Sequence, residues 1–171
     1  IYDRLVGSEM CIRDRYKPTS SNNNGELVIP QIETQNLNLI DAEGNVFNFS
    51  TGKWYLVHFD DFQNKTFSLD RYKLATSLKI TLPRESHRLR RVVVYKDKEL
   101  FANALELKEQ FPQIIFLYDK DNMFENRISS QLNNPYFSKS MFLIDSFSNV
   151  MEEFNVSLTF SEIFEDLKVL L

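Results

Sequence analysis

Apolar residues recur along this chain with two alternating spacings. Short apolar runs between turn residues predict strands, and apolar residues three or four positions apart predict helices that cover a sheet. The expected strands are Leu37–Ile40, Val46–Phe49, Trp54–Phe59, Val92–Tyr95, Ile114–Tyr118, Met141–Asp145 and Val150–Phe154. The expected helices are Ser68–Lys79, Glu99–Phe111, Asp121–Gln131 and Thr159–Leu171.

The order of these elements predicts the fold class. The strand Trp54–Phe59 is apolar on both faces, as a parallel strand covered on both sides should be. β-α-β units follow it, and then an antiparallel hairpin and a last helix. Ser68 is interpreted as the N-cap of the first helix. We expect an α/β protein with a thioredoxin-like three-layer sandwich and an N-terminal β-hairpin.

The first 35 residues lack this alternation. Residues 16–35 begin with the polar stretch YKPTSSNNNG and are interpreted as a linker. Within it, Glu26–Gln31 is a short apolar patch that can lean on the domain. The domain itself is expected over residues 36–171, and residues 1–25 are expected to be disordered.

Leu5–Arg15 (LVGSEMCIRDR) matches, residue for residue, the translation of a transposase adapter used to build sequencing libraries. We therefore interpret residues 1–15 as an artefact and exclude them from fold reasoning. Cys11, the single cysteine, lies inside this segment. From Tyr16 onward the chain offers no thiol for catalysis, for metal binding or for a disulfide.

Composition and charge exclude several classes of function. The net charge is -4 and no basic face stands out, which argues against a nucleic-acid partner. With 4 Gly and no glycine-rich phosphate motif, a nucleotide cradle is not expected. No apolar run approaches the roughly 18–20 residues that a membrane helix needs.

Four segments carry a resemblance to a known family. They are Lys17–Pro30 (KPTSSNNNGELVIP), the GKWYLVHF strand, the FLIDSFSNVM hairpin and the closing EDLKVLL helix. In this order and spacing the chain resembles the Sco (SenC-type) thioredoxin-like family. It is most similar to membrane-anchored proteobacterial relatives associated with cytochrome oxidase assembly genes.

The departures from the family pattern concern its metal and redox residues. Sco proteins carry a CxxxC motif after the first central strand and a later histidine, which together bind copper. The resemblance places these positions at Asn64, Ser68 and Phe137. An amide, a hydroxyl and a phenyl ring cannot replace two thiolates and an imidazole. No catalytic, cofactor-binding or metal-binding residue is therefore carried over, and no cofactor is expected.

Other polar residues have a functional and a plain interpretation. His58 with Asp60 and Asp61 could form a metal site, but no third convergent ligand is visible, and a hydrogen-bonded histidine beside solvated carboxylates is favoured. His87 lies in the basic run Arg84–Arg91, which is interpreted as a solvated surface.

Two loops complete the candidates. The segment Asp119–Asn122 resembles part of a calcium loop but lacks its glycine and later glutamate, so it is interpreted as a turn that caps the next helix. The aromatic loop Asp60–Phe67 and the edge at Tyr136–Phe137 could bind a protein. Phe62 and Phe67 could equally belong to the core.

Two hypotheses about function follow. The first is a non-catalytic module that resembles Sco-type oxidase assembly factors and binds a protein, such as respiratory oxidase subunits or assembly factors. The alternative is a copper chaperone or a thiol-disulfide oxidoreductase of the Sco/thioredoxin type; an enzyme of another kind has no residue cluster to support it. The resemblance also implies a bacterial inner-membrane protein, with an N-terminal anchor missing from this sequence and the domain facing the periplasm.

Overall fold

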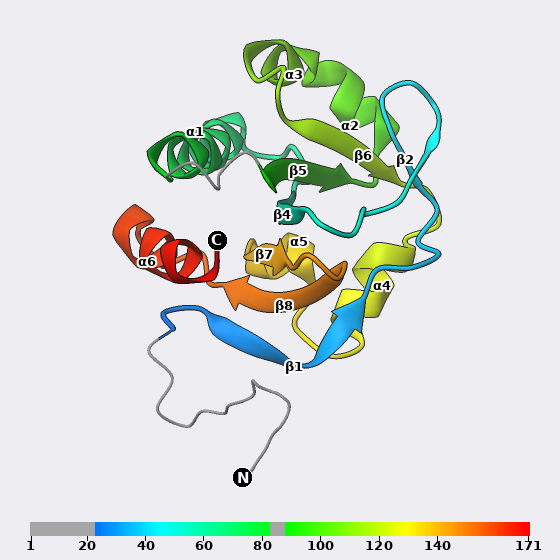
Figure 1. The fold of residues 1–171 in the computed structure, drawn as a ribbon. Coiled ribbons are helices and arrows are strands. Elements are labelled where there is room, and N and C mark those ends of the chain that lie inside the picture. Colours follow the sequence, from blue (N-terminus) through cyan, green and yellow to red (C-terminus); the bar gives the residue numbers. More distant parts are fainter. Residues whose placement is uncertain (1–22, 83–87) are drawn as a thin grey trace, which may run out of the picture.

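The structure is a computed structural model that describes residues 23–82 and 88–171. Within these ranges eight strands form one sheet in the order β1-β8-β7-β4-β5-β6-β2-β3 (Figure 1). The strands are β1 (Glu26–Glu33), β2 (Leu39–Ile40), β3 (Val46–Phe47), β4 (Trp54–Phe59), β5 (Leu89–Tyr95), β6 (Ile115–Asp119), β7 (Met141–Ile144) and β8 (Asn149–Phe154). The helices are α1 (Lys65–Thr81), α2 (Lys98–Asn103), α3 (Leu105–Gln110), α4 (Met123–Ser129), α5 (Pro135–Ser138) and α6 (Phe160–Leu170).

The centre of the sheet is parallel. β4 pairs with β5, and β5 with β6, in parallel register, and α1 and the α2–α3 pair make the crossovers. β7 pairs antiparallel with the other edge of β4, and β8 with β7. The hairpin β2–β3 extends the far side of the sheet through β6. The expected thioredoxin-like α/β class and the N-terminal hairpin are confirmed.

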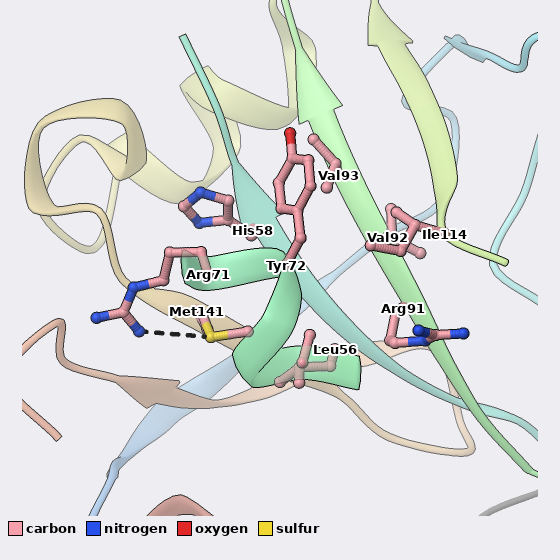
Figure 2. A pocket seen from close by; sticks show the side chains of 10 residues that line it. Leu56, His58, Arg71, Tyr72, Arg91, Val92, Val93, Ile114 and Met141 are labelled. Carbon is pink, nitrogen blue, oxygen red and sulfur yellow. Dashed lines mark hydrogen bonds between the residues drawn. The ribbon is translucent and has the colours of Figure 1, made fainter. Parts of the chain in front are cut away.

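Helices α1, α3 and α6 cover one face of the sheet. Leu56 of β4 and Met141 of β7 point toward this face, where α1 crosses them (Figure 2). They pack in one cluster with Leu78 of α1 and with Ile163 and Leu167 of α6. Burial of this apolar stripe holds both helices on the sheet.

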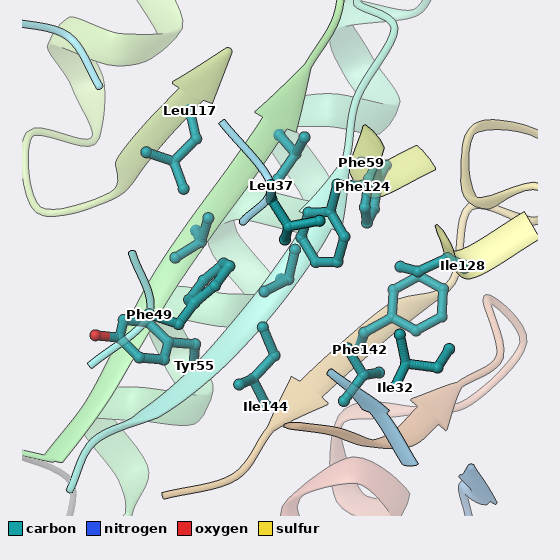
Figure 3. Close-up of a cluster of buried hydrophobic side chains, with 14 of the residues drawn as sticks. Ile32, Leu37, Phe49, Tyr55, Phe59, Leu117, Phe124, Ile128, Phe142 and Ile144 are labelled. Carbon is teal, nitrogen blue, oxygen red and sulfur yellow. The ribbon is translucent and has the colours of Figure 1, made fainter. Parts of the chain in front are cut away.

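Helix α4 and the β2–β3 region cover the opposite face. Phe59 of β4 lies against Phe124 of α4, with ring centroids 5.0 Å apart, and against Phe142 of β7 at 5.8 Å (Figure 3). Phe49, which follows the hairpin, joins the same cluster. Edge-on aromatic contacts of this kind add to the energy of apolar burial. The two covered faces make the three-layer sandwich that the sequence predicts.

The N-terminal segment joins the sheet. The predicted linker includes Glu26–Glu33, which forms edge strand β1 against β8 and buries Val28 and Ile32 in the core. The preceding turn is fixed by α6, since Gly25 N donates to Asp166 Oδ2 at 2.9 Å. The ordered domain therefore extends beyond the expected start at residue 36. Only two of the eight residues of β1 are buried, so the sequence alone has the pattern of a linker and does not reveal the pairing with β8.

A buried carboxyl lies under this turn. Glu152 of β8 is fully buried, and its pKa is raised to about 10 by burial first and then by a hydrogen bond and charge repulsion from Asp166. Glu152 is therefore protonated at neutral pH and lies beside the Asp166 carboxylate. A Cβ on Gly25 would lie 2.6 Å from Glu152 Oε2 and 2.9 Å from Glu153 O, so only glycine allows this close approach.

Three local predictions differ from the structure. The single helix expected over Glu99–Phe111 is split at Ala104, whose N–H bonds the carbonyl of Phe101 three residues back. No helix was expected between Gln131 and Met141, but the short helix α5 lies there, and Asn134 caps it by accepting from Tyr136 N. β5 begins at Leu89, so the end of the basic run Arg84–Arg91, interpreted from the sequence as a solvated surface, lies within the sheet.

Some predictions fall on residues that the structure does not describe. Cys11 and the whole adapter-like segment Leu5–Arg15 precede the described residues, as does residue 16, where the expected linker begins. His87 lies in the second gap. No described helix is both long and apolar enough to cross a membrane.

Candidate functional site

The candidate site lies where β4 ends and α1 begins. This is the carboxyl edge of the parallel strands, where open α/β sheets bind their ligands. Asp60 follows β4 directly and is buried. Its Oδ2 accepts from the Tyr72 hydroxyl at 2.6 Å and its Oδ1 from Phe62 N at 2.8 Å. The expectation that Asp60 is a solvated carboxylate is wrong, because these two donors hold it inside.

The two positions that the resemblance assigns to cysteines, Asn64 and Ser68, lie at the start of α1. Asn64 is the N-cap, and its Oδ1 accepts from Phe67 N at 3.1 Å. Ser68, predicted to be the cap, lies one turn inside the helix, and its N–H donates to Asn64 O at 3.0 Å. The Ser68 hydroxyl is buried and has no hydrogen-bond partner in the described part of the chain. The N-cap belongs to Asn64 because the helix starts three residues earlier than predicted.

His58 lies on β4 below this junction. It is 3% exposed, and neither ring nitrogen has a hydrogen-bond partner among residues 23–82 and 88–171. Burial is the largest cause that lowers its pKa, to about 4, so the imidazole is neutral at physiological pH. The rings of Phe67 and Tyr72 lie 6.1 and 6.4 Å from it. The expectation of a hydrogen-bonded histidine at this position is wrong.

A small cavity borders the histidine. Its volume is about 10 Å³, close to the minimum for one water molecule. Figure 2 shows His58, Arg71 and Met141 on one side and Arg91 on the other. Arg71 is held away from the histidine, since its Nη2 donates to Val156 O at 2.7 Å and its Nη1 lies 3.7 Å from Met141 Sδ.

The segment from α5 to β7 closes the other side of the site. Lys139 Nζ lies 3.8 Å from Asp61 Oδ2 and 5.5 Å from the centre of the Phe67 ring. These contacts bring the segment that carries Phe137 against the β4–α1 loop. The Phe137 side chain itself is 85% exposed, whereas the neighbouring Tyr136 is buried. Phe62 is buried and Phe67 is half-buried, so the aromatic loop divides between core and surface.

A second polar cluster lies beyond β5 and was not predicted. Lys96 Nζ lies 3.0 Å from Glu125 Oε2, which also accepts from Asn134 Nδ2 at 2.8 Å. Lys96 also lies over the Tyr136 ring, 4.7 Å from its centre. Burial raises the pKa of Tyr136, and the nearby carboxylates of Asp119 and Glu125 raise it further. Only the position of Lys96 directly after a strand hinted at this cluster in the sequence.

Asp119 is structural. Its Oδ1 accepts from Phe124 N at 3.2 Å and its Oδ2 from Glu125 N at 2.9 Å, so its carboxylate ties the first turn of α4 to the end of β6. The interpretation of this segment as a capping turn is confirmed.

The chemistry open to this site follows from these groups. No cysteine occurs among the described residues, so the β4–α1 junction presents an amide and a hydroxyl where a redox or copper site needs thiolates. In the described ranges no group of three or more His, Cys, Asp or Glu residues could hold a metal ion. The Lys139–Asp61 pair lies beside the half-buried Phe67, and Phe137 is exposed on the same segment as Lys139, a mixture of aromatic and charged groups suited to protein contact.

The fold and this junction define an α/β protein with a thioredoxin-like fold. Among solved structures the chain is similar to copper-bound ScoI from Arabidopsis thaliana, with 15% identity, TM-score 0.61, 77% of this chain covered and 92% of that one. It is similar to apo Sco1 from Thermus thermophilus, with 13% identity, TM-score 0.62, 90% of this chain covered and 100% of that one.

A third similar structure is the thioredoxin domain of a thiol-disulfide oxidoreductase from Bacteroides vulgatus, with 16% identity and a TM-score of 0.56. The match covers 88% of this chain and 100% of that one. At these identities the likeness establishes the shared fold. No protein-family model and no curated protein sequence matches the chain.

Proposed function

We propose that this protein is a non-catalytic module of the Sco type that acts by binding a protein during respiratory oxidase assembly. The observation that supports the proposal most is the structural use of both motif positions. Asn64 caps α1, and Ser68 is buried in its first turn. Solved neighbours include a member of the Sco family of cytochrome c oxidase assembly proteins, which suggests the process.

The partner would bind at the carboxyl edge of the sheet. Phe137 is exposed on α5, two residues before Lys139, which lies near Asp61 and the Phe67 ring. An exposed aromatic side chain surrounded by polar groups is a common centre of a protein interface. We expect Phe137→Asp to lower co-purification with oxidase subunits or assembly factors. Phe147→Asp is the matched control, since Phe147 is also exposed but lies in the β7–β8 turn at the opposite end of the sheet.

Copper and thiol chemistry test the non-catalytic part of the proposal. The chain without residues 1–15 is expected to bind no Cu(I) at the β4–α1 loop and to show no disulfide reductase activity, because both need thiolates. A Cu(I) titration in the presence of a competing chelator and an insulin reduction assay measure this. Tight copper binding by this unmodified chain would refute the proposal.

Restoration of the motif tests the residue correspondence. Asn64→Cys, Ser68→Cys and Phe137→His in one chain should create a Cu(I) site, with Asn64→Cys and Ser68→Cys alone as the control that lacks the imidazole. Positions 64 and 68 are one helical turn apart, with the Ser68 N–H donating to Asn64 O. If the triple variant binds no more tightly than the double variant, Phe137 does not correspond to the family histidine.

The alternative function is a copper chaperone or thiol-disulfide oxidoreductase. Copper-bound Sco proteins and a thiol-disulfide oxidoreductase among the solved neighbours favour it. The same copper and reductase assays separate it from the first proposal. Both proposed functions include the same location, at the inner membrane with the domain in the periplasm. A complete gene that starts just before Tyr16, with no hydrophobic segment, would refute that location.

A further inference from the structure

A surface pocket of about 450 Å³ lies at the opposite end of the sheet from the candidate site. It is formed between the last turns of α1, the start of β5 and the segment that leads into β6. Its size falls within the range of pockets that bind small molecules. The lining residues are Thr76, Lys79, Ile80, Arg91, Gln110, Phe111, Pro112 and Gln113.

The charged residues of this lining are both cations. Arg91 is 8% exposed, and its Nη1 donates to Thr76 Oγ1 at 2.8 Å. Its Nε has no hydrogen-bond partner in the described ranges. Lys79 Nζ donates to Leu89 O at 2.7 Å. Neither cation is paired with a carboxylate among the described residues.

Among the described residues, the charge of this lining is therefore positive and incompletely neutralised. Burial lowers the pKa of Arg91, and burial together with the Arg90 and Arg91 charges lowers the pKa of Lys79. A buried cation without an opposite charge is costly, and an anion that enters the pocket reduces that cost. Low-dielectric walls strengthen the attraction.

The other side of the pocket is apolar. Ile80 is 76% exposed, although it lies on a helix whose other apolar residues face the core. Phe111 is fixed by an edge-on contact with Tyr72, with centroids 5.5 Å apart. Pro112 follows directly. An apolar ligand group placed here would cover Ile80 and gain the usual energy of apolar burial.

We propose that this pocket binds a small organic carboxylate with an apolar body. The carboxylate accepts hydrogen bonds from the Arg91 guanidinium near Lys79, and the apolar body lies against Ile80 and Phe111. A guanidinium suits this role because its planar donors match the two oxygens of a carboxylate. The site is separate from the proposed interface at the carboxyl edge, and its test does not depend on that function.

Octanoate is the probe, and the chain of residues 1–171 is titrated with it under NMR observation of the backbone amides. We expect saturable shifts at residues 76–80 and 110–113. Octan-1-ol, which has the same body without charge, and acetate, which has the charge without the body, should each bind at least about tenfold more weakly. Equal binding of octan-1-ol, or shifts that map elsewhere, would overturn the proposal.

Two exposed positions provide matched variants. Ile80→Glu places a negative charge beside the expected carboxylate and should weaken octanoate binding at least about tenfold. Val169→Glu introduces the same change at a residue that is 80% exposed on α6, away from the pocket, and should bind as the parent does. Arg91→Gln should also weaken binding. Unchanged affinity in Ile80→Glu would refute the site even if Arg91→Gln fails to fold.

Discussion

His58 and Glu152 are ionisable side chains that the fold keeps neutral. Both point from the sheet toward the face covered by α1 and α6, His58 from β4 and Glu152 from β8. Burial is the main cause of both pKa shifts, but the shifts act on opposite sides of neutral pH. Each residue therefore contributes a distinct pH dependence to the free energy of unfolding.

For His58 the dependence appears in acid. Its pKa is about 4 in the folded chain and 6.5 in the unfolded one, so the unfolded state binds more protons between these values. Above pH 6.5, His58 does not reduce the free energy of unfolding. As pH falls toward 4, this residue lowers the free energy of unfolding by about 2–3 kcal/mol. His58→Leu should flatten this acid limb in urea unfolding measured from pH 7 to 4. Parallel curves for the variant and the parent would contradict the assignment.

For Glu152 the dependence runs the other way. Its pKa is about 10 when folded and 4.5 when unfolded, so its contribution is complete below pH 4.5 and is lost as pH rises toward 10. Glu152→Gln is neutral at every pH and needs no bound proton to be so. The variant should be more stable by about 1–3 kcal/mol at pH 7 and equal to the parent near pH 4. Thermal unfolding at both pH values measures this, and an equal gain at pH 4 would show a packing effect instead.

At the scale of the elements, the start of α1 decides the geometry of the candidate site. Asn64 both ends the β4–α1 loop and caps the helix, while Asp60 and Tyr72 fix the loop beneath it. The Ser68 hydroxyl and both His58 ring nitrogens have no partner among the described residues, but the side-chain oxygens of Asn64 and Asp60 both border the site and serve the fold. This dual use explains how the chain keeps the junction intact without a motif of thiols.

Loss of the Asn64 N-cap should therefore destabilise helix α1. Asn64→Ala removes the acceptor for Phe67 N and is expected to cost about 1 kcal/mol of stability. Asn64→Ser retains an acceptor and should recover most of that loss. Urea unfolding of the three chains measures the difference. Equal losses in both variants would mean that the Asn64 side chain acts in some other way.

For the whole molecule, the N-terminal strand completes the sandwich. β1 covers the edge of β8 and contributes Val28 and Ile32 to the core. Asn24 and Gly25 connect it to α6 through Asp166, with N–H donors 3.0 and 2.9 Å from the carboxylate oxygens. An uncovered β8 would present an open sheet edge, which favours aggregation.

Two truncations test this role. Removal of residues 1–33 should destabilise the domain by at least about 3 kcal/mol, since two buried aliphatic side chains are lost. Removal of residues 1–22 should leave the unfolding midpoint unchanged, because every contact described for β1 remains. Chemical unfolding of both chains against the parent gives the comparison. An equally stable chain without residues 1–33 would place the start of the domain at residue 36, as the sequence alone predicted.

The sequence by itself determined the elements whose burial is written in their own residues. Trp54–Phe59 is apolar on both faces and matches β4 at both ends. The last helix was predicted to start at Thr159, which forms a capping box with Glu162. Such features depend on neighbours within a few positions, and their order was enough to predict the thioredoxin-like fold.

Only the tertiary structure decided features that depend on partners far along the chain. β1 became a strand because β8 supplies its hydrogen bonds, and Glu152 became protonated because it is buried, beside Asp166. The pocket beside Arg91 exists because α1 and the approach to β6 converge there. Burial and charge at these positions are properties of the packed molecule, since groups more than a hundred residues apart, such as the Gly25 backbone N–H and the Asp166 carboxylate, set them together.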